Sequence, residues 1–474
     1  MKYEVVMGLE VHIELATRSK LFCACSAHFG ANPNENVCPA CSGMPGIPAI
    51  VNKKAVELGI AAALLTNSEV ARVMTFDKKN YFYPDLPTGH QITQLFAPIC
   101  QNGCVEIETS KGKKNITLKQ IHIEEDAGKL IHDTRTGTSL IDFNRTSVPL
   151  IEIVSNPGFN EAEEVIAYLE KLRSSLSFAG VSDCKMQEGS MRCDVNISVR
   201  PIGTEKLGTR AEIKNMNSMK AITAAIEYEA NRQIEALETG DELVQETRRW
   251  DDNNGVTLSM RGKEEAADYR YFPNPEIMPV VIGAEWVEAV RASLPESAED
   301  KLARLMGELG LSEYESKRIT GSKTLSDIFD STLKYFNKPK DVSNWILEEL
   351  LSIAKGDNKG EDDIKIDSSR FAKLIELVDN KTINRNTGKT ILVKVLKEGI
   401  DPAAYVEENQ LAMVNDTGAI EKAVDEVLAA NTKSVEEYRS GSQKVLGFLV
   451  GQTMKKMGGK ADPVAVNEII RGRL

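Results

Sequence analysis

The chain has 474 residues, a formal net charge of −12, 42% hydrophobic and 27% charged residues, which is typical of a soluble globular protein of about three domains. An acidic chain is a poor non-specific binder of nucleic acid, because such binding depends on Lys and Arg neutralising phosphates. No apolar run reaches membrane-spanning length, and the start Met1–Glu4 lacks the regions of a signal peptide. We therefore expect a cytoplasmic protein that does not contact a membrane.

The first predicted element is a strand over residues 7–15. Its polar residues Glu10, His12 and Glu14 alternate with apolar ones, so the two kinds point to opposite faces. The segments 121–124, 194–199 and 210–214 repeat this alternation. Their polar positions are His122, Glu124, Asp194, Asn196, Ser198, Arg210, Glu212 and Lys214. If these strands share a sheet, their polar faces form one surface rich in carboxylates, which predicts a site for magnesium and phosphate. The alternative is that these polar residues form the solvent-exposed face of ordinary antiparallel strands.

Four cysteines form two close pairs in a loop rich in Gly, Pro and Asn. They are Cys23, Cys25, Cys38 and Cys41. This spacing predicts a closed structural zinc site over residues 23–41, with unligated thiols or another thiophilic metal as the alternatives. The other four, Cys100, Cys104, Cys184 and Cys193, show no such pairing, and we interpret them as buried thiols.

The pattern of elements predicts an α+β protein. Residues 1–294 combine a mixed or antiparallel sheet with few helices, the clearest over 160–177 and 221–237, and the chain is helical after Pro295. We predict an all-helical domain over 295–404 and a small helical tail over 405–474. The segment 439–474 has seven basic and two acidic residues, a net charge of +5, which favours the tail as a contact for nucleic acid.

Several long motifs carry a family resemblance. Residues 77–94, with the sequence DKKNYFYPDLPTGHQITQ, resemble the B subunit of the aspartyl/glutamyl-tRNA amidotransferases. Further matches are GLEVH at 8–12, EEDAGK at 124–129, DFNR at 142–145, PLIEIV at 149–154, RCDVN at 192–196, QETRR at 245–249, DYRYFP at 268–273, GFLVGQ at 447–452 and PVAVN at 463–467. The resemblance covers essentially the whole chain.

The resemblance implies an N-terminal cradle domain, a helical domain and a helical tail that contacts tRNA. It also implies two partners in a heterotrimer, an amidase (the A subunit) that frees ammonia from glutamine and a small C subunit. The implied activity is that of a carbon–nitrogen ligase with glutamine as the amide donor. ATP phosphorylates the side-chain carboxylate of Glu or Asp misacylated onto the tRNA for Gln or Asn, and ammonia then displaces the phosphate. ATP, magnesium and structural zinc are the implied cofactors.

The family's metal-binding groups fall at Glu10, His12, Glu125, Asp194 and Glu212, with Glu124 and Glu152 close in the pattern. The alternation favours Glu124 as a metal ligand and the resemblance favours Glu125, so both alternatives stay open. Candidates for phosphate or transition-state charge are Lys79, Lys129, Arg145, Arg192, Arg210, Lys214 and Arg270. Candidates for stacking on adenine or the terminal nucleotide are Tyr81, Tyr83, Tyr269 and Tyr271. Glu10, His12, Lys79, Arg192 and Lys214 are the expected catalytic set.

The chain departs from the family pattern at Lys78, where Arg is usual, and at His90, where Tyr is usual. His90 could alter a contact in the acceptor-end pocket. Two other functions stay open: a non-catalytic tRNA-binding scaffold, and a metallohydrolase with a metal-bound water. The motifs also leave open whether Glu-tRNA, Asp-tRNA or both are substrates.

Overall fold

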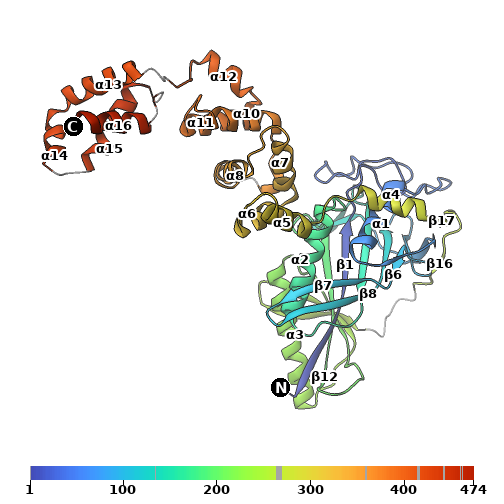
Figure 1. The fold of residues 1–474 in the computed structure, drawn as a ribbon. Helices are drawn as coiled ribbons and strands as arrows, with labels where there is room; N and C mark the ends of the chain where they lie inside the picture. The colour runs from blue at the N-terminus through green and yellow to red at the C-terminus, as the bar shows by residue number, and fades with distance from the viewer. Residues whose placement is uncertain are drawn as a thin grey trace. The chain divides into compact units, whose positions relative to one another are not determined.

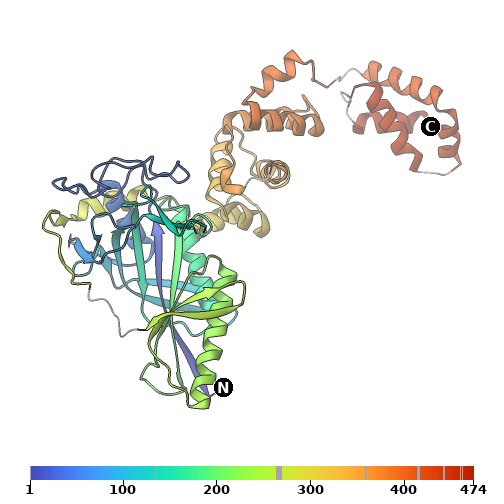
Figure 2. The same cartoon turned by 180° about the vertical axis from the view of Figure 1, so that it is seen from behind.

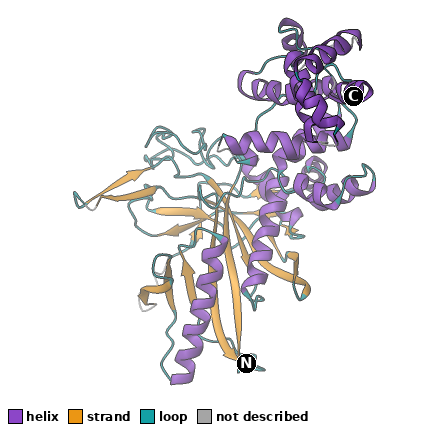
Figure 3. Ribbon diagram, turned by 90° about the vertical axis from the view of Figure 1, so that its left-hand side faces the viewer, coloured by secondary structure: helices purple, strands orange, loops and turns teal. Residues whose placement is uncertain are grey.

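A computed structural model describes residues 2–133, 135–262, 269–357, 360–413, 417–440, 444–458, 461 and 463–474. The chain divides into two compact units, Met1–Ser297 and Ala298–Leu474. Figure 3 shows that strands occur in the first unit, whereas the described part of the second consists of helices and loops. The α+β organisation predicted from the sequence is confirmed.

A mixed ten-stranded sheet forms the centre of the first unit. Its order is β15 (Val256–Gly262), β14 (Glu246–Asp251), β13 (Ala211–Lys214), β12 (Met191–Pro201), β1 (Tyr3–Glu14), β11 (Pro149–Ser155), β8 (Gly112–Glu125), β6 (Cys100–Gln101) and β2 (Glu69–Val70), with β7 (Cys104–Thr109) also paired to β8. All neighbours are antiparallel except β13 and β14. The four segments predicted to alternate therefore share one sheet.

Small sheets and helices complete this unit. The remaining strands are β3 (Val73–Met74), β4 (Asp77–Asn80), β5 (His90–Thr93), β9 (Lys129–Asp133), β10 (Thr138–Asp142), β16 (Phe272–Pro273) and β17 (Val280–Val281). The helices are α1 (Lys53–Leu65), α2 (Ala162–Phe178), α3 (Met219–Thr239) and α4 (Ala284–Ser293). Residues 15–52, which we call the cysteine loop, contain turns and an isolated bridge between Ser19 and Ser26.

One face of the large sheet is covered by helices and the other carries the polar residues. Figure 1 shows α2 and α3 beside the strands, and Figure 2 shows the unit from behind. Leu9, Val11 and Ile13 are almost completely buried in one core with Val165 of α2 and Ile222 of α3. Because side chains alternate along a strand, burial of these residues turns Glu10, His12 and Glu14 to the opposite face.

The second unit contains two separate hydrophobic cores. Its first helices are α5 (Ala298–Gly307), α6 (Glu313–Thr320), α7 (Lys323–Leu333), α8 (Pro339–Asn344), the π-helical η2 (Trp345–Leu350), α9 (Leu351–Gly356), η3 (Glu361–Asp363), α10 (Ser368–Asp379), α11 (Arg385–Glu398) and α12 (Pro402–Glu408). The tail helices are α13 (Thr417–Ala430), α14 (Thr432–Arg439), α15 (Lys444–Lys456) and α16 (Pro463–Arg473). No helix in the described residues is long and apolar enough to cross a membrane.

The cores place the domain boundaries slightly later than the sequence pattern does. The first unit ends at Ser297 rather than at 294. A boundary at 405 would cut α12, whose Val406 is buried in the core of the helical domain, whereas the tail core begins with Ile420. Asp401 caps α12 by accepting a hydrogen bond from the backbone of Ala404, so this helix begins before residue 405.

Candidate functional site

Strand register brings a first polar cluster together at the centre of the sheet. His12 of β1 lies opposite Glu152 of β11, and Glu152 lies opposite His122 of β8. Glu124 follows His122 by two residues and so points the same way. The Nε2 atom of His12 is 3.4 Å from Glu124 Oε1 and 3.6 Å from Glu152 Oε2, and His122 Nε2 is 2.6 Å from Glu152 Oε2.

The imidazoles and carboxylates of this cluster stabilise each other's charged forms. Burial opposes protonation of His122, but the Glu152 and Glu124 carboxylates outweigh it and raise the pKa of His122 to about 10. The pKa of His12 is raised as well, with burial again opposed by Glu124 and Glu152. Burial would raise the pKa of Glu124, yet the two imidazoles hold it well below the ordinary value. The carboxylates are therefore ionised and paired with the two imidazoles.

A second cluster lies beside the first, on β1, β12 and β13. Glu10 is opposite Asp194, and Asn196 is opposite Glu212. The Nδ2 atom of Asn196 donates to Glu10 Oε1 at 3.1 Å. The Lys214 ammonium lies between Asp194 Oδ2 and Glu212 Oε1, 2.9 Å from the latter, and the two carboxylates outweigh burial to raise the lysine pKa.

Both clusters fit a small divalent cation. In each of them the possible ligand atoms, one from each of three residues, lie within 4.8 Å of one another. Octahedral magnesium holds oxygen atoms at about 2.1 Å, which places opposite ligands about 4.2 Å apart. Lys214 already occupies a cation position in the second cluster. We call the six residues Glu10, His12, Glu124, Glu152, Asp194 and Glu212 the carboxylate face.

A third polar group borders the carboxylate face at the end of β1. The Oδ2 atom of Asp126 accepts a hydrogen bond from Arg192 Nη2 at 2.8 Å and is 3.4 Å from Arg145 Nε. Burial, followed by the charge of Asp126, raises the pKa of Glu14 to about 7. The sequence identified both arginines but missed Asp126 and Glu14 as their neighbours. Glu14 continues the period-two pattern of Glu10 and His12, so the signal was present for this residue.

The candidate aromatic residues form a cluster at Lys79. The rings of Tyr81 and Tyr269 meet edge-to-face at 5.8 Å, and those of Tyr269 and Tyr271 at 6.0 Å. The Lys79 ammonium lies 4.9 Å from the centre of the Tyr269 ring. Burial raises the pKa of Tyr81 and of Tyr271, and the charge of Glu124 adds to both shifts, which places this cluster next to the carboxylate face. Tyr83 is 53% exposed.

Three other candidate cations are exposed. Lys129 begins β9, and Arg210 directly precedes β13. Burial opposes the lowered pKa of Glu212. The charge and hydrogen bond of Lys214 outweigh burial, and the charge of Arg210 adds to the lowering of this pKa. Arg270 has a positive φ of 43°, and its carbonyl accepts a hydrogen bond from Asn80. Asp268, which begins the same motif, lies outside the described residues.

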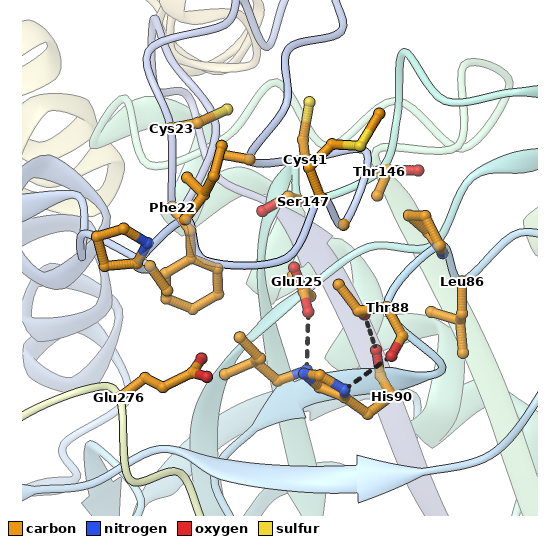
Figure 4. Close-up of a pocket in the computed structure, with 18 of the residues that line it drawn as sticks. Phe22, Cys23, Cys41, Leu86, Thr88, His90, Glu125, Thr146, Ser147 and Glu276 are labelled. Carbon is orange, nitrogen blue, oxygen red and sulfur yellow. Dashed lines mark hydrogen bonds between the residues drawn. The ribbon is translucent and has the colours of Figure 1, made fainter.

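Glu125 points away from Glu124 and lines a separate pocket of about 210 Å³ beside the cysteine loop (Figure 4). Its Oε1 atom accepts a hydrogen bond from the backbone of Ile92 at 2.9 Å. Burial raises the pKa of Glu125 to about 7. Lys78 and His90, the two departures from the family pattern, line the same pocket. The structure thus brings Glu124, and not Glu125, together with His12 and Glu152.

The four loop cysteines converge, as their spacing predicts. Their sulfur atoms all lie within 4.8 Å of one another, and the Sγ atoms of Cys38 and Cys41 are 3.9 Å apart. A tetrahedral zinc site with bonds of about 2.3 Å places its sulfurs about 3.8 Å apart, so the cluster fits zinc. A hydrogen bond from Cys23, with smaller contributions from the backbone of Cys38 and the charge of Lys20, lowers the pKa of Cys41, and the same hydrogen bond raises the pKa of Cys23.

The basic residues of the tail divide into two groups. Lys456 pairs with Glu426, and Arg473 lies 3.3 Å from Glu421 and 3.4 Å from Asp425. Arg439, Lys455 and Arg471 are exposed. Lys460 and the acidic Asp462 lie outside the described residues, as does the side chain of Lys444.

Comparison with known proteins covers nearly the entire chain. Residues 5–288 match the model of the GatB/GatE catalytic domain, and residues 327–474 match that of the GatB domain. The chain is 52% identical over 468 residues to the B subunit of the aspartyl/glutamyl-tRNA(Asn/Gln) amidotransferase of Agathobacter rectalis, covering 99% of this chain and 98% of the relative. It is 51% identical over 469 residues to the B subunit of the same enzyme from Lachnoclostridium phytofermentans, with the same coverage. It is also 51% identical over 477 residues to that of Caldicellulosiruptor bescii, covering 100% of this chain and 99% of the relative.

Proposed function

This chain belongs to the B-subunit family of the aspartyl/glutamyl-tRNA(Asn/Gln) amidotransferases, and from that premise we propose the reaction that its carboxylate face carries out. The B subunit is one part of a glutamine-dependent ligase that forms carbon–nitrogen bonds. We assign to this chain the activation step, in which ATP phosphorylates the side-chain carboxylate of Glu or Asp carried by a misacylated tRNA for Gln or Asn. Ammonia then converts the acyl phosphate to the amide.

The observation that supports this proposal is the adjacency, on one face of the sheet, of two clusters whose side chains could hold a cation. The charge of Glu152, from the first cluster, helps burial to raise the pKa of Glu10 in the second, so the two clusters interact directly. Phosphoryl transfer needs positioned positive charge around the phosphates, with little covalent chemistry from the protein. A non-catalytic scaffold would not need two adjacent groups of three possible cation ligands in a half-buried position.

The bonds that form and break in the two steps of the reaction define what the residues must do. A carboxylate oxygen of the substrate bonds to the γ-phosphorus of ATP as the bond from that phosphorus to the bridging oxygen breaks, releasing ADP. The ammonia nitrogen then bonds to the side-chain carbon, the carbon–oxygen bond to phosphate breaks, and the protonated nitrogen of the adduct loses one proton to solvent to give the amide. Both steps move negative charge, so the cations around the carboxylate face stabilise them.

We assign the following roles to this chain's residues. The carboxylate face would hold magnesium, which when bound neutralises phosphate charge. Lys79, Arg192 and Lys214 supply further positive charge at the reacting phosphate. Tyr81 and Tyr83 stack on adenine, and Lys129, Arg145, Arg210 and Arg270 contact phosphates. The cysteine cluster would hold structural zinc, which orders a loop that has little core of its own.

Partners and recognition follow from the same proposal. The chain works in a heterotrimer with an amidase, the A subunit, which frees ammonia from glutamine, and with a small C subunit. The acceptor end of the tRNA binds at the carboxylate face, and the exposed Arg439, Lys455 and Arg471 of the tail contact the tRNA body.

An isotope experiment tests the activation step. The complex is supplied with ammonium, ATP and Glu-tRNA whose side-chain carboxylate carries a heavy oxygen isotope. Formation of an acyl phosphate transfers one heavy oxygen to inorganic phosphate for each amide made. Unlabelled phosphate alongside amide formation would refute the proposal. Glu-tRNA labelled only at the ester carbonyl is the control, and it should release unlabelled phosphate.

A further inference from the structure

The cysteine loop is hydrogen-bonded to a distant segment of the chain, residues 141–145. Asn34 makes three of these bonds. Its backbone N–H donates to Asp142 Oδ1 at 3.0 Å, its Nδ2 donates to the carbonyl of Ile141 at 2.9 Å, and its Oδ1 accepts from the N–H of Phe143 at 2.8 Å. Asn34 has φ = 59°, a left-handed conformation that Asn tolerates better than most residues. This residue is therefore shaped for the contact.

A second asparagine pair extends the contact. The backbone N–H of Asn36 donates to Asn144 Oδ1 at 2.8 Å, and Asn144 Nδ2 donates to the carbonyl of Asn32 at 2.6 Å. Residues 141–144 are thus bonded to the cysteine loop at every position, through backbone or side-chain atoms. Together these bonds restrain the conformation of the short turn from both its backbone and its side-chain atoms.

Lys20 connects this turn to the cysteine cluster itself. Its side chain is fully buried, and its ammonium lies 3.5 Å from Cys41 Sγ and 3.1 Å from the carbonyl of Phe143. Four thiolates around one zinc ion carry a net charge of −2, and a buried ammonium beside them offsets part of that charge. The same nitrogen atom therefore contacts both the metal ligands and the turn.

The turn ends at Arg145, which reaches the border of the carboxylate face. Arg145 Nε donates to the carbonyl of Ala127 at 3.0 Å, and Nη2 donates to the carbonyl of Gly128 at 2.9 Å. These bonds hold the guanidinium beside Asp126, the residue that also binds Arg192. A shift of the turn would move Arg145 away from its partner.

We propose that the cysteine loop positions Arg145 at the carboxylate face, with Lys20 and Asn34 as the positioning residues. The role assigned to Arg145 rests on the proposed function, whereas the link between the loop and the turn does not. The cysteine loop has no helix or strand of its own to keep it ordered. Leu21 and Phe22 anchor one part of the loop in the core of the first unit, a bound metal would order the part around the four cysteines, and the order of the turn depends on the loop.

Hydrogen exchange tests the link without any activity measurement. In the assembled complex, removal of zinc with a chelator should speed exchange in a peptide that contains residues 141–147, since the N–H of Phe143 is protected by Asn34. A peptide from the β7–β8 hairpin should be unaffected. Lys20→Met should produce the same local change in the zinc-loaded protein and weaken zinc binding about 10- to 100-fold. Unchanged exchange in residues 141–147 after zinc removal would overturn the proposal.

A double-mutant cycle tests the consequence for the reaction. Asn34→Ala should lower kcat/KM for ammonium-supported amidation about tenfold, and it should have little further effect when Arg145→Gln is present. Asn34→Asp, which keeps the acceptor for Phe143, should recover part of the loss. Asn67→Ala is the matched control, because Asn67 is also left-handed but lies in the turn after α1. Additive effects of Asn34→Ala and Arg145→Gln would overturn the proposed positioning. No effect of Arg145→Gln alone would instead refute the role of Arg145, and the exchange experiment would still decide whether the link exists.

Discussion

The carboxylate face and the cysteine loop lie in the same unit, but different interactions hold their side chains in place. Glu10 and His12 are on a twelve-residue strand that is paired along both edges. Cys23 and Cys41 are in a segment without helix or strand, held by hydrogen bonds and by each other. Removing a carboxylate from the face leaves the strand ladder intact. Removing a cysteine from the loop removes part of what holds the loop together.

This difference separates catalysis from stability. Substitutions on the carboxylate face should lower the rate of the reaction and leave the stability of the fold unchanged. Substitutions in the cysteine loop should lower stability more than they lower the rate. Glu10→Gln, Asp194→Asn and Cys38→Ser test that separation directly, whereas Glu125→Gln and truncation of the tail test neighbouring parts of the chain, and all are given in order of decreasing free-energy effect.

The largest effect is expected for Glu10→Gln and Asp194→Asn. Each keeps the shape of the side chain and removes a charge that would bind a cation at the phosphates, so acyl-phosphate formation should fall about a thousandfold, or about 4 kcal/mol. The measurement is phosphate release and amide formation from misacylated tRNA with saturating ammonium. Glu108→Gln, at an exposed position on β7, is the control. Near-normal rates would show that the face is only a solvated sheet surface.

Glu125→Gln should change the pH dependence of stability. The folded-state pKa of Glu125 is about 7, above its ordinary value of 4.5, so the folded chain keeps a proton that the unfolded chain releases. The contribution of this group to the free energy of unfolding is fully present below pH 4.5. It is lost as the pH rises through about 7, a decrease of about 3 kcal/mol. Calorimetric unfolding of the first unit between pH 4.5 and 8 should show a smaller decline in the variant than in the wild type. Parallel profiles would contradict the raised pKa.

Cys38→Ser should weaken zinc binding on the order of 100-fold and lower the thermal stability of the first unit. The rate of amidation with ammonium should fall less than in Glu10→Gln, through the displaced Arg145. Metal analysis of protein purified without chelator, together with a zinc competition titration, provides the measurement. Cys104→Ser, outside the cluster, is the control. Wild-type protein that contains no zinc or other thiophilic metal would refute the ligand assignment.

Truncation after Met413 should have the smallest effect. It preserves the core of the helical domain, to which Met413 is bonded through Thr382, and removes the tail. We expect about tenfold weaker tRNA binding, near 1.4 kcal/mol, and a shallower salt dependence because phosphate contacts are lost. Binding assays over a range of salt concentrations would measure both. An unchanged affinity and slope would place the tRNA contacts elsewhere.

The sequence was most informative where side-chain spacing determines geometry. Alternation predicted that Glu10 and His12 share a face, and the strands that carry the other ligands do lie in the same sheet. Alternation also distinguishes Glu124 from Glu125, because neighbours on a strand must point to opposite sides. The family resemblance alone favoured Glu125, which lines a pocket on the other side.

Contacts between distant loops were beyond the reach of the sequence. Nothing in the spacing of Asp126 shows that it binds both Arg145 and Arg192, since the three residues come from different segments. The bonds between Asn34 and residues 141–143 join positions more than one hundred residues apart. Such pairings depend on how loops pack after the sheet has formed, and no local period encodes them.

The central position of β1 has a consequence for how this gene can change. Leu9 donates its backbone N–H to Ser155 Oγ at 2.8 Å, beside the point where the pairing of β11 with β8 shifts register. That bond helps fix the alignment of β1. Losing or gaining one codon between Tyr3 and Glu10 would turn the strand residues before the change to the opposite face, because the core holds Val11 and Ile13 in place. This segment can therefore accept replacement of individual outward-facing residues more readily than any change in its length.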